Sequence, residues 1–320
     1  MTLAAPSTLK NPILDIAASF WDDERYRAFR ICYRSMRVMD DVVDDLKSAG
    51  QAGEAERDNV RARLRQTLTA IETEGAAPRE APDLLPAEIE ELRETIKRFS
   101  IPLWPWRSLA RAMEFDLSHN GFRSFLQFAR YARGAAVAPA SVFVHLIGLS
   151  DEDGRFRPAP VDCYTSARPL AMFSYMTHIM RDFRRDFSEG LEYFPQNMRD
   201  WFGVSPRDLR AAGAGEQTER FSAMVRGYHT LAGGYRERAR PSSLPICTHL
   251  CEIYRFSLTV IWELYSQIHE KIAEADFDLD PELIHPAVDE IYARIDVTRG
   301  KMGISKSELE RGASRLGMRL

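Results

Sequence analysis

The hydrophobic residues of this chain recur with the period of an α-helix over most of its length. Between residues 25 and 46 the apolar side chains return every three or four positions, at Phe29, Cys32, Tyr33, Met36, Met39 and Val43. Strand-like alternation is nearly absent, and glycine and proline are scattered. The pattern therefore predicts an all-α protein, and it contains no internal repeat.

Prolines, glycines and polar runs divide this pattern into separate helices. The expected helices cover residues 11–20, 25–46, 54–74, 87–98, 107–117, 122–149, 161–189, 205–213, 216–238, 245–275 and 281–299. Pro139 is expected to bend the helix at 122–149, residues 76–86 to form a proline-rich linker, and 154–160 a loop. We expect residues 1–300 to form a single helical domain and 301–320 a basic C-terminal tail.

Two acidic clusters lie far apart in this helical pattern. The first reads RVMDDVVDD at residues 37–45, and the second reads HIMRDFRRD at residues 178–186. Each contains two aspartates four residues apart, Asp40 with Asp44 and Asp182 with Asp186, which places both carboxylates on one face of a helix. Like charges at this spacing repel each other and destabilise a helix. A positive partner must therefore compensate them.

Magnesium together with a diphosphate is a suitable partner. Mg²⁺ prefers oxygen ligands and is commonly held by one or two carboxylates plus substrate phosphates. Arg37 lies one turn before Asp40, and Arg181 adjoins Asp182, so guanidinium groups are in place to bind phosphate oxygens. For either cluster alone, a solvated polar helix face explains the charges equally well. Both clusters have large apolar neighbours, however, which favours two helices lining one interior cavity.

Composition narrows the range of partners and locations expected for this chain. The 320 residues are 45% hydrophobic, which is enough for a sizeable core, and the net charge of −4 makes nucleic acid an unexpected partner. The four cysteines lack a zinc-binding spacing, so we expect reduced thiols and a cytoplasmic protein. The most apolar stretch, 134–149, is short and contains Pro139. We therefore expect no transmembrane anchor and at most transient contact with a membrane surface.

The chain resembles the squalene and phytoene synthase family. Ser19-Phe20 followed by the first acidic cluster is similar to the first aspartate-rich region of that family. The second cluster, with EGLEYFP at residues 189–195, is similar to the second region. The segments AMEFDL (112–117), FLQFARY (125–131) and YSQIHEKIAEADFD (265–278) also resemble parts of the family, so the likeness covers most of the chain.

This resemblance implies an isoprenoid-synthase helical bundle around a central apolar cavity. Members of the family use magnesium to join two prenyl diphosphates, of the farnesyl or geranylgeranyl class, head to head. The residues that match catalytic, metal-binding aspartates are Asp40, Asp44, Asp182 and Asp186, and those that match substrate-binding positions are Ser19, Arg37, Tyr131, His178 and Arg181. Use of NADPH stays open, because the family carries out its reductive step without a dinucleotide fingerprint.

The chain departs from the family pattern near the predicted site. His178 stands where the family has a metal-binding Asn, and a histidine is a poorer magnesium ligand than an oxygen donor. We expect His178 to form a hydrogen bond, for example with Asp182, more readily than to bind metal. Tyr175 replaces a Gln, Leu191 replaces an Arg, and Pro139 interrupts a small, glycine-rich stretch.

These departures leave two alternatives to head-to-head condensation. The first is a class I terpene cyclase that acts on one prenyl diphosphate, with carbocations stabilised by aromatic side chains. The candidates for such a lining are Phe20, Phe29, Tyr33, Phe128, Tyr131, Phe173 and Tyr175. The second is a non-catalytic binding or assembly protein. Retention of all four mutually repelling aspartates argues against that second alternative.

Overall fold

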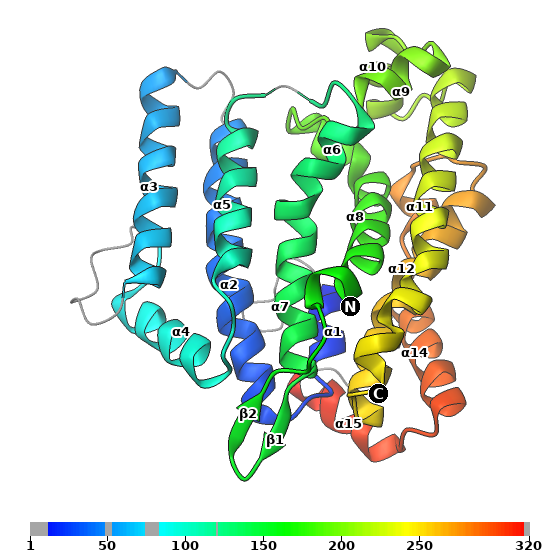
Figure 1. Cartoon of the computed structure of the whole chain (residues 1–320). Helices are drawn as coiled ribbons and strands as arrows, with labels where there is room; N and C mark the ends of the chain where they lie inside the picture. Colours follow the sequence, from blue (N-terminus) through cyan, green and yellow to red (C-terminus); the bar gives the residue numbers. More distant parts are fainter. Residues whose placement is uncertain (1–11, 49–52, 74–82, 120, 317–320) are drawn as a thin grey trace.

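The computed structural model describes residues 12–48, 53–73, 83–119 and 121–316, and these fold almost entirely into helices (Figure 1). The first half of the chain contains α1 Pro12–Ala18, α2 Asp23–Ser48, α3 Glu54–Glu72, α4 Pro86–Arg98, α5 Trp104–Asp116, α6 Phe125–Ala132, the π-helix η1 Arg133–Val137 and α7 Ala138–Ile147. The second half contains α8 Cys163–Ser188, α9 Gln196–Phe202, α10 Pro206–Gly213, α11 Glu219–Cys247, α12 Glu252–Glu274, α13 Pro281–Ile284, α14 Val288–Met302 and α15 Lys306–Arg315.

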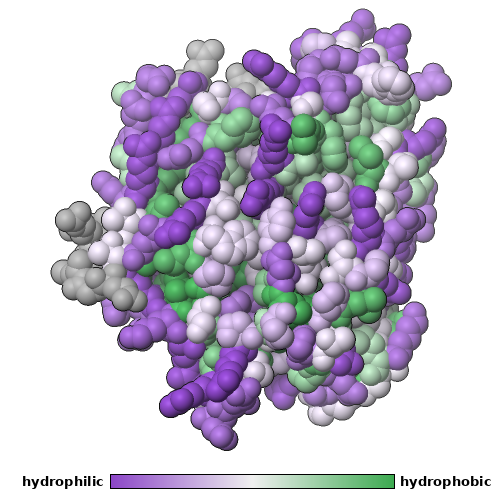
Figure 2. All heavy atoms as spheres, viewed as in Figure 1, coloured by the Kyte–Doolittle hydropathy of each residue, from purple (hydrophilic) through white to green (hydrophobic). Residues whose placement is uncertain are grey.

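The long helix α8 is the central element of the bundle. It packs against α7, η1, α11 and α12, while α2 packs on the other side of α7 (Figure 1). Apolar side chains from all of these helices form one buried cluster that extends from Ile13 in α1 to Leu309 in α15. Burial of this apolar surface is the main stabilising contribution to such a bundle. On the face shown in Figure 2, hydrophilic side chains predominate and the hydrophobic ones form small separate areas.

Two expectations about secondary structure are wrong. Residues 150–157 form an antiparallel hairpin, β1 Ser150–Glu152 and β2 Arg155–Arg157, where a loop was expected from residue 154. Asp153 and Gly154 both have positive φ values, 53° and 80°, as a tight two-residue hairpin turn requires. Helix α11 also continues through Pro241 and Pro245, where a break was expected, and the break comes instead at 248–251, inside the helix expected over 245–275. Both prolines are exposed, so solvent can bind the carbonyls that lose their helical partners.

The C-terminal segment includes a helix that contacts the start of the chain. In α15, Arg315 donates a 2.9 Å hydrogen bond to the carbonyl of Ser19, and Leu309 is buried. The proline-rich linker at 76–86 lies largely outside the described residues. Within the described residues, no helix combines the length and the apolar character needed to cross a membrane.

Pro139 changes the helix around it in a specific way. The residues just before Pro139 form the π-helix η1, in which the N–H of Ala138 bonds to the carbonyl of Arg133, five residues earlier. Gly134 lets η1 approach α5 closely, because a Cβ atom at this position would lie 2.3 Å from the carbonyl oxygen of Ser108. The absence of a side chain at Gly134 therefore permits the short distance between η1 and α5.

We predict that Gly134→Ala destabilises the protein. The added methyl group would meet backbone atoms of α5 that cannot rotate away, and overpacking of this kind costs about 1–3 kcal/mol. Denaturant unfolding measures the loss. Gly300→Ala in α14 is the matched control, because nothing lies within 4 Å of the new Cβ and alanine favours a helix by about 0.8 kcal/mol over glycine. Equal effects of the two substitutions would contradict the prediction.

Candidate active site

A cavity of about 560 Å³ lies between α2, α8 and the helices around them. Its charged residues come from the C-terminal halves of α2 and α8, which run in the same direction with these ends at the top of Figure 1. They are Arg37, Asp40, Asp44, His178, Asp182, Arg185, Asp186 and Glu189, the last from just beyond α8. The two acidic clusters of the sequence therefore meet at one cavity.

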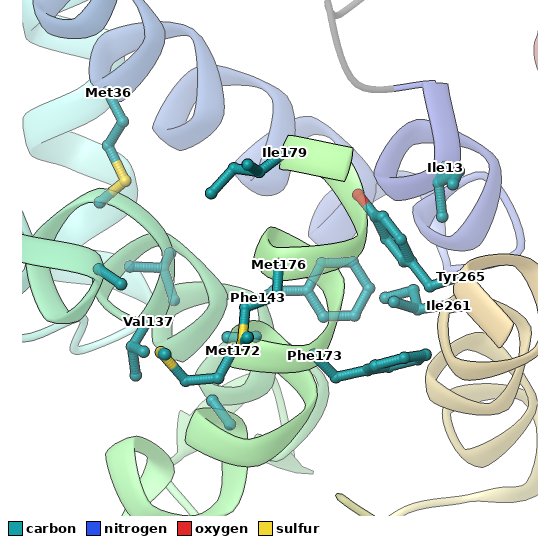
Figure 3. Close-up of a cluster of buried hydrophobic side chains, with 14 of the residues drawn as sticks. Ile13, Met36, Val137, Phe143, Met172, Phe173, Met176, Ile179, Ile261 and Tyr265 are labelled. Atoms are coloured by element: carbon teal, nitrogen blue, oxygen red, sulfur yellow. The ribbon is translucent and has the colours of Figure 1, made fainter. Parts of the chain in front are cut away.

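The earlier turns of the same helices supply an apolar wall. Figure 3 shows the buried cluster beside the cavity, to which α2, α7, α8 and α12 contribute. Of the residues labelled in Figure 3, those that also line the cavity are Met36, Phe143, Ile179, Ile261 and Tyr265. The cavity thus combines charged groups with an apolar lining, and its volume lies in the range of about 300–1,000 Å³ typical of small-molecule sites.

The structure brings together seven of the nine site residues expected from the sequence. All four aspartates line the cavity, and so do Arg37, Tyr131 and His178. Ser19 does not: it is fully buried, and its hydroxyl donates a 2.7 Å hydrogen bond to the carbonyl of Ile16. Arg181 does not line the cavity either, but it contacts two residues that do, Asp182 and His178.

In the first cluster, one guanidinium contacts three aspartates. Arg37 Nη1 lies 2.5 Å from Asp40, and its Nη2 lies 2.7 Å from Asp41 and 3.5 Å from Asp44. Burial alone would lower the pKa of Arg37, but Asp40 and Asp41 raise that pKa above its ordinary value. Arg37 therefore stays charged and offsets the repulsion that the aspartate spacing creates.

In the second cluster, Asp182 is enclosed by cationic and polar donors. Arg181 binds it through two nitrogens, Nε at 2.7 Å and Nη2 at 2.8 Å. The side chain of Asp182 is only 4% exposed, and this burial works to raise its pKa. Hydrogen bonds from Arg181 and His178 outweigh burial and hold the pKa of Asp182 well below its usual range. Asp182 is therefore a carboxylate over the whole physiological pH range.

His178 is held in one orientation by its neighbours. Its Nδ1 lies 2.9 Å from Arg181 Nη2, and its Nε2 lies 2.9 Å from Asp182 Oδ2. Because an arginine can only donate, Nδ1 accepts this hydrogen bond and Nε2 carries the proton toward Asp182. Both ring nitrogens are thus engaged in hydrogen bonds, as the sequence analysis favours over metal ligation.

Arg185 is a cavity residue that the sequence analysis did not select. It donates to Asp182 at 2.8 Å and to Asp186 at 2.9 Å, and its side chain is 60% exposed. Burial raises the pKa of Asp186, and the nearby charge of Arg185 opposes that rise. The signal was present in the sequence, since Arg185 lies within the second cluster and three residues after Asp182.

Asp116 is a second residue that the sequence analysis missed. It lies in the segment AMEFDL (112–117), but a single aspartate at the end of a helix carried no recognisable signal. Its buried carboxylate is 2.8 Å from Lys47 Nζ and accepts a 3.2 Å hydrogen bond from the hydroxyl of Tyr131. Burial, together with the negative charge of Asp116, raises the pKa of Tyr131 well above its usual value. The phenol therefore stays protonated beside the cavity.

The structure separates the candidate aromatic lining into two groups. Tyr33, Tyr131 and Tyr175 line the cavity. The four candidate phenylalanines lie in the packed core, at Phe20, Phe29, Phe128 and Phe173. Two further tyrosines line the cavity, Tyr193 and Tyr265, so every aromatic residue on this wall except Phe143 carries a hydroxyl group.

The donor set is compatible with magnesium bound jointly with phosphate. Among the described residues, no group of three or more His, Cys, Asp or Glu side chains is close enough to hold a metal ion alone. Each helix instead offers a pair of carboxylates, and such pairs suit Mg²⁺, which completes its shell with water and substrate phosphates. Arg37 and Arg185 are then available to share the phosphate charge.

Comparison with known sequences agrees with the resemblance. The family model described as squalene/phytoene synthase matches residues 15–291. Similar proteins include the chloroplastic phytoene synthase 3 of Zea mays, 27% identical over 187 residues, which are 58% of this chain and 42% of the relative. The chloroplastic phytoene synthase 1 of Zea mays is 25% identical over 256 residues, 80% of this chain and 57% of the relative. The chain spans about half the length of these curated relatives.

Comparison with solved structures confirms the expected fold. A dehydrosqualene synthase in complex with ligand has a TM-score of 0.70 at 15% identity, over 92% of this chain and 93% of that chain. The squalene synthase HpnC from Alicyclobacillus acidocaldarius has a TM-score of 0.61 at 19% identity, over 82% and 88% of the two chains. The bundle is thus the isoprenoid-synthase helical fold. Because the family model also matches most of the sequence, this chain belongs to the squalene/phytoene synthase family.

Proposed function

We propose that this protein is a magnesium-dependent prenyltransferase that ionises an allylic prenyl diphosphate and joins two such molecules head to head. The observation that supports this proposal is the meeting of both aspartate pairs at one cavity with an apolar wall. A prenyl diphosphate has the same division, with a charged head and an apolar chain. Farnesyl and geranylgeranyl diphosphates are therefore the substrates to test first.

Asp40, Asp44, Asp182 and Asp186 would hold the magnesium ions together with the substrate diphosphate. When bound, magnesium supplies positive charge that stabilises the departing diphosphate. Side chains of the protein also stabilise the departing diphosphate. Arg37 remains charged next to Asp40 and can bind diphosphate oxygens, which adds fixed electrostatic stabilisation at the point where negative charge develops.

The apolar wall has a different task, which is to bind the prenyl chain and exclude water. Met36, Ile179 and Ile261 line the cavity beside the charged end, so a prenyl chain there would be in contact with hydrocarbon. Exclusion of water protects a carbocation from premature capture. Tyr131 and Tyr175 face this space as neutral phenols, because burial raises the pKa of both groups well above the usual value.

A terpene cyclase on the same fold is the second candidate. The observation that favours it is the row of tyrosines on the cavity wall, Tyr33, Tyr131, Tyr175, Tyr193 and Tyr265. Aromatic faces attract cations, and a cyclisation passes through several carbocations. A non-catalytic role is a weaker candidate, because both aspartate pairs and their arginines remain assembled at the cavity.

We predict that Asp40→Asn and Asp182→Asn each lower turnover of prenyl diphosphates by about 10²-fold or more, the scale expected when one electrostatic stabiliser of a transition state is removed. Release of diphosphate measures turnover. Asp45→Asn is the matched control, since Asp45 belongs to the same cluster but is exposed and does not line the cavity. Full activity of both cavity variants would exclude the proposed chemistry.

We also predict a product with twice the carbon number of the substrate. The purified protein is incubated with farnesyl or geranylgeranyl diphosphate and magnesium, with and without NADPH, and the products are analysed by mass spectrometry. A doubled chain supports head-to-head condensation, and its hydrogen content reports whether NADPH is used. A cyclic product with the carbon number of the substrate would assign the protein to the cyclases instead.

A further inference from the structure

The Oδ2 atom of Asp182 has no free position for a metal ion in the arrangement described above. Its Oδ1 accepts from Arg181 Nε at 2.7 Å. Its Oδ2 lies within 2.9 Å of three donors: Arg181 Nη2, Arg185 Nη2 and His178 Nε2. Each carboxylate oxygen offers about two acceptor positions, so the three donors saturate Oδ2, while Oδ1, with one donor, keeps a position open. A metal ion can bind Oδ2, the oxygen that Arg185 contacts, only if one of its three donors leaves.

Arg185 is the donor that can leave most easily. Arg181 is held by two bonds to Asp182 and a third to His178, and its side chain is only 13% exposed. Arg185 makes a single bond to Asp182 beside its contacts with Asp186, but its side chain is 60% exposed, against 27% for His178. A long exposed arginine can rotate away from the helix while its charge stays in solvent.

Arg185 also donates hydrogen bonds to Asp186, the second aspartate of the pair. Its Nε and Nη2 lie 3.2 and 2.9 Å from Asp186 Oδ1, so one guanidinium bridges the two carboxylates that the proposed function assigns to magnesium. Departure of Arg185 without a replacement would leave two carboxylates one helical turn apart with less positive charge, which is unfavourable. Arg185 and a metal ion therefore compete for the same face of α8.

We propose that Arg185 is a diphosphate-binding residue that, before the ligand arrives, occupies the metal-binding face of the Asp182–Asp186 pair. Arg185 would leave the two carboxylates when they hold magnesium, and its guanidinium would then bind the diphosphate. This inference rests on the proposed function. It adds Arg185 as a diphosphate-binding residue and a coupling between binding of the metal and binding of the diphosphate. Arg185 lines the cavity, so a rotated side chain stays within the binding space.

The exchange makes binding of the metal and of the diphosphate depend on each other. Magnesium alone must break the Arg185 contacts and leaves the guanidinium without an anionic partner. When diphosphate is also present, Arg185 exchanges one anion for another and keeps its charge-assisted hydrogen bonds. Each ligand therefore strengthens binding of the other by the same factor, as thermodynamic linkage requires.

The test measures binding by titration calorimetry with Arg185→Gln, using MgCl₂ alone and inorganic diphosphate in saturating MgCl₂. We expect Arg185→Gln to bind magnesium alone several-fold more tightly than the unmodified protein, because its carboxylates are no longer occupied. We expect its affinity for diphosphate to fall about tenfold, the scale of one charge-assisted hydrogen bond. A merely structural role for Arg185 would not move the two affinities in opposite directions.

Arg184→Gln is the matched control, because it removes the same charge from the adjacent position. Arg184 does not line the cavity, and it pairs with Asp278 and Asp280, which follow α12. We expect Arg184→Gln to leave both affinities near their original values. If Arg185→Gln behaves like Arg184→Gln, the role of Arg185 is refuted while the proposed function stands. If the unmodified protein binds neither magnesium nor diphosphate, the proposed function itself is refuted.

Discussion

Repulsion between four carboxylates around one cavity is the constraint on which the rest of this structure depends. The spacing of Asp40 with Asp44, and of Asp182 with Asp186, places like charges one helical turn apart on α2 and α8. Folding then brings the two pairs to the same cavity. The arrangement persists because cations lie at matching positions, with Arg37 beside the first pair and Arg181 and Arg185 beside the second.

The apolar part of the site follows from the same two helices. Their earlier turns carry apolar side chains at helical spacing, so one continuous face changes from hydrocarbon to charge along its length. The wall that η1 supplies is placed by a close contact, that of Gly134 against the backbone of α5. The cavity is thus a consequence of helix periodicity combined with small residues at the points where helices approach each other.

The second cluster differs from the first in how its charge is compensated. Asp182 is surrounded by three side chains of its own helix, two of which are arginines, and its pKa is well below the usual range. His178 completes this set by accepting from Arg181 and donating to Asp182. The histidine that departs from the family pattern therefore supports the carboxylate through hydrogen bonds, which explains how the acidic pair is retained beside it.

The sequence by itself determined the features that depend on local spacing. These are the helical class, the aspartate pairs with their arginines, and the family, since all are encoded within a few turns of helix. Only the tertiary structure decided which side chains face the cavity. It placed Ser19 in a buried turn, divided the seven candidate aromatics between cavity and core, and joined Asp116 to Lys47 and Tyr131. These outcomes depend on how helices rotate and pack against partners distant in the chain, which periodicity along one helix does not specify.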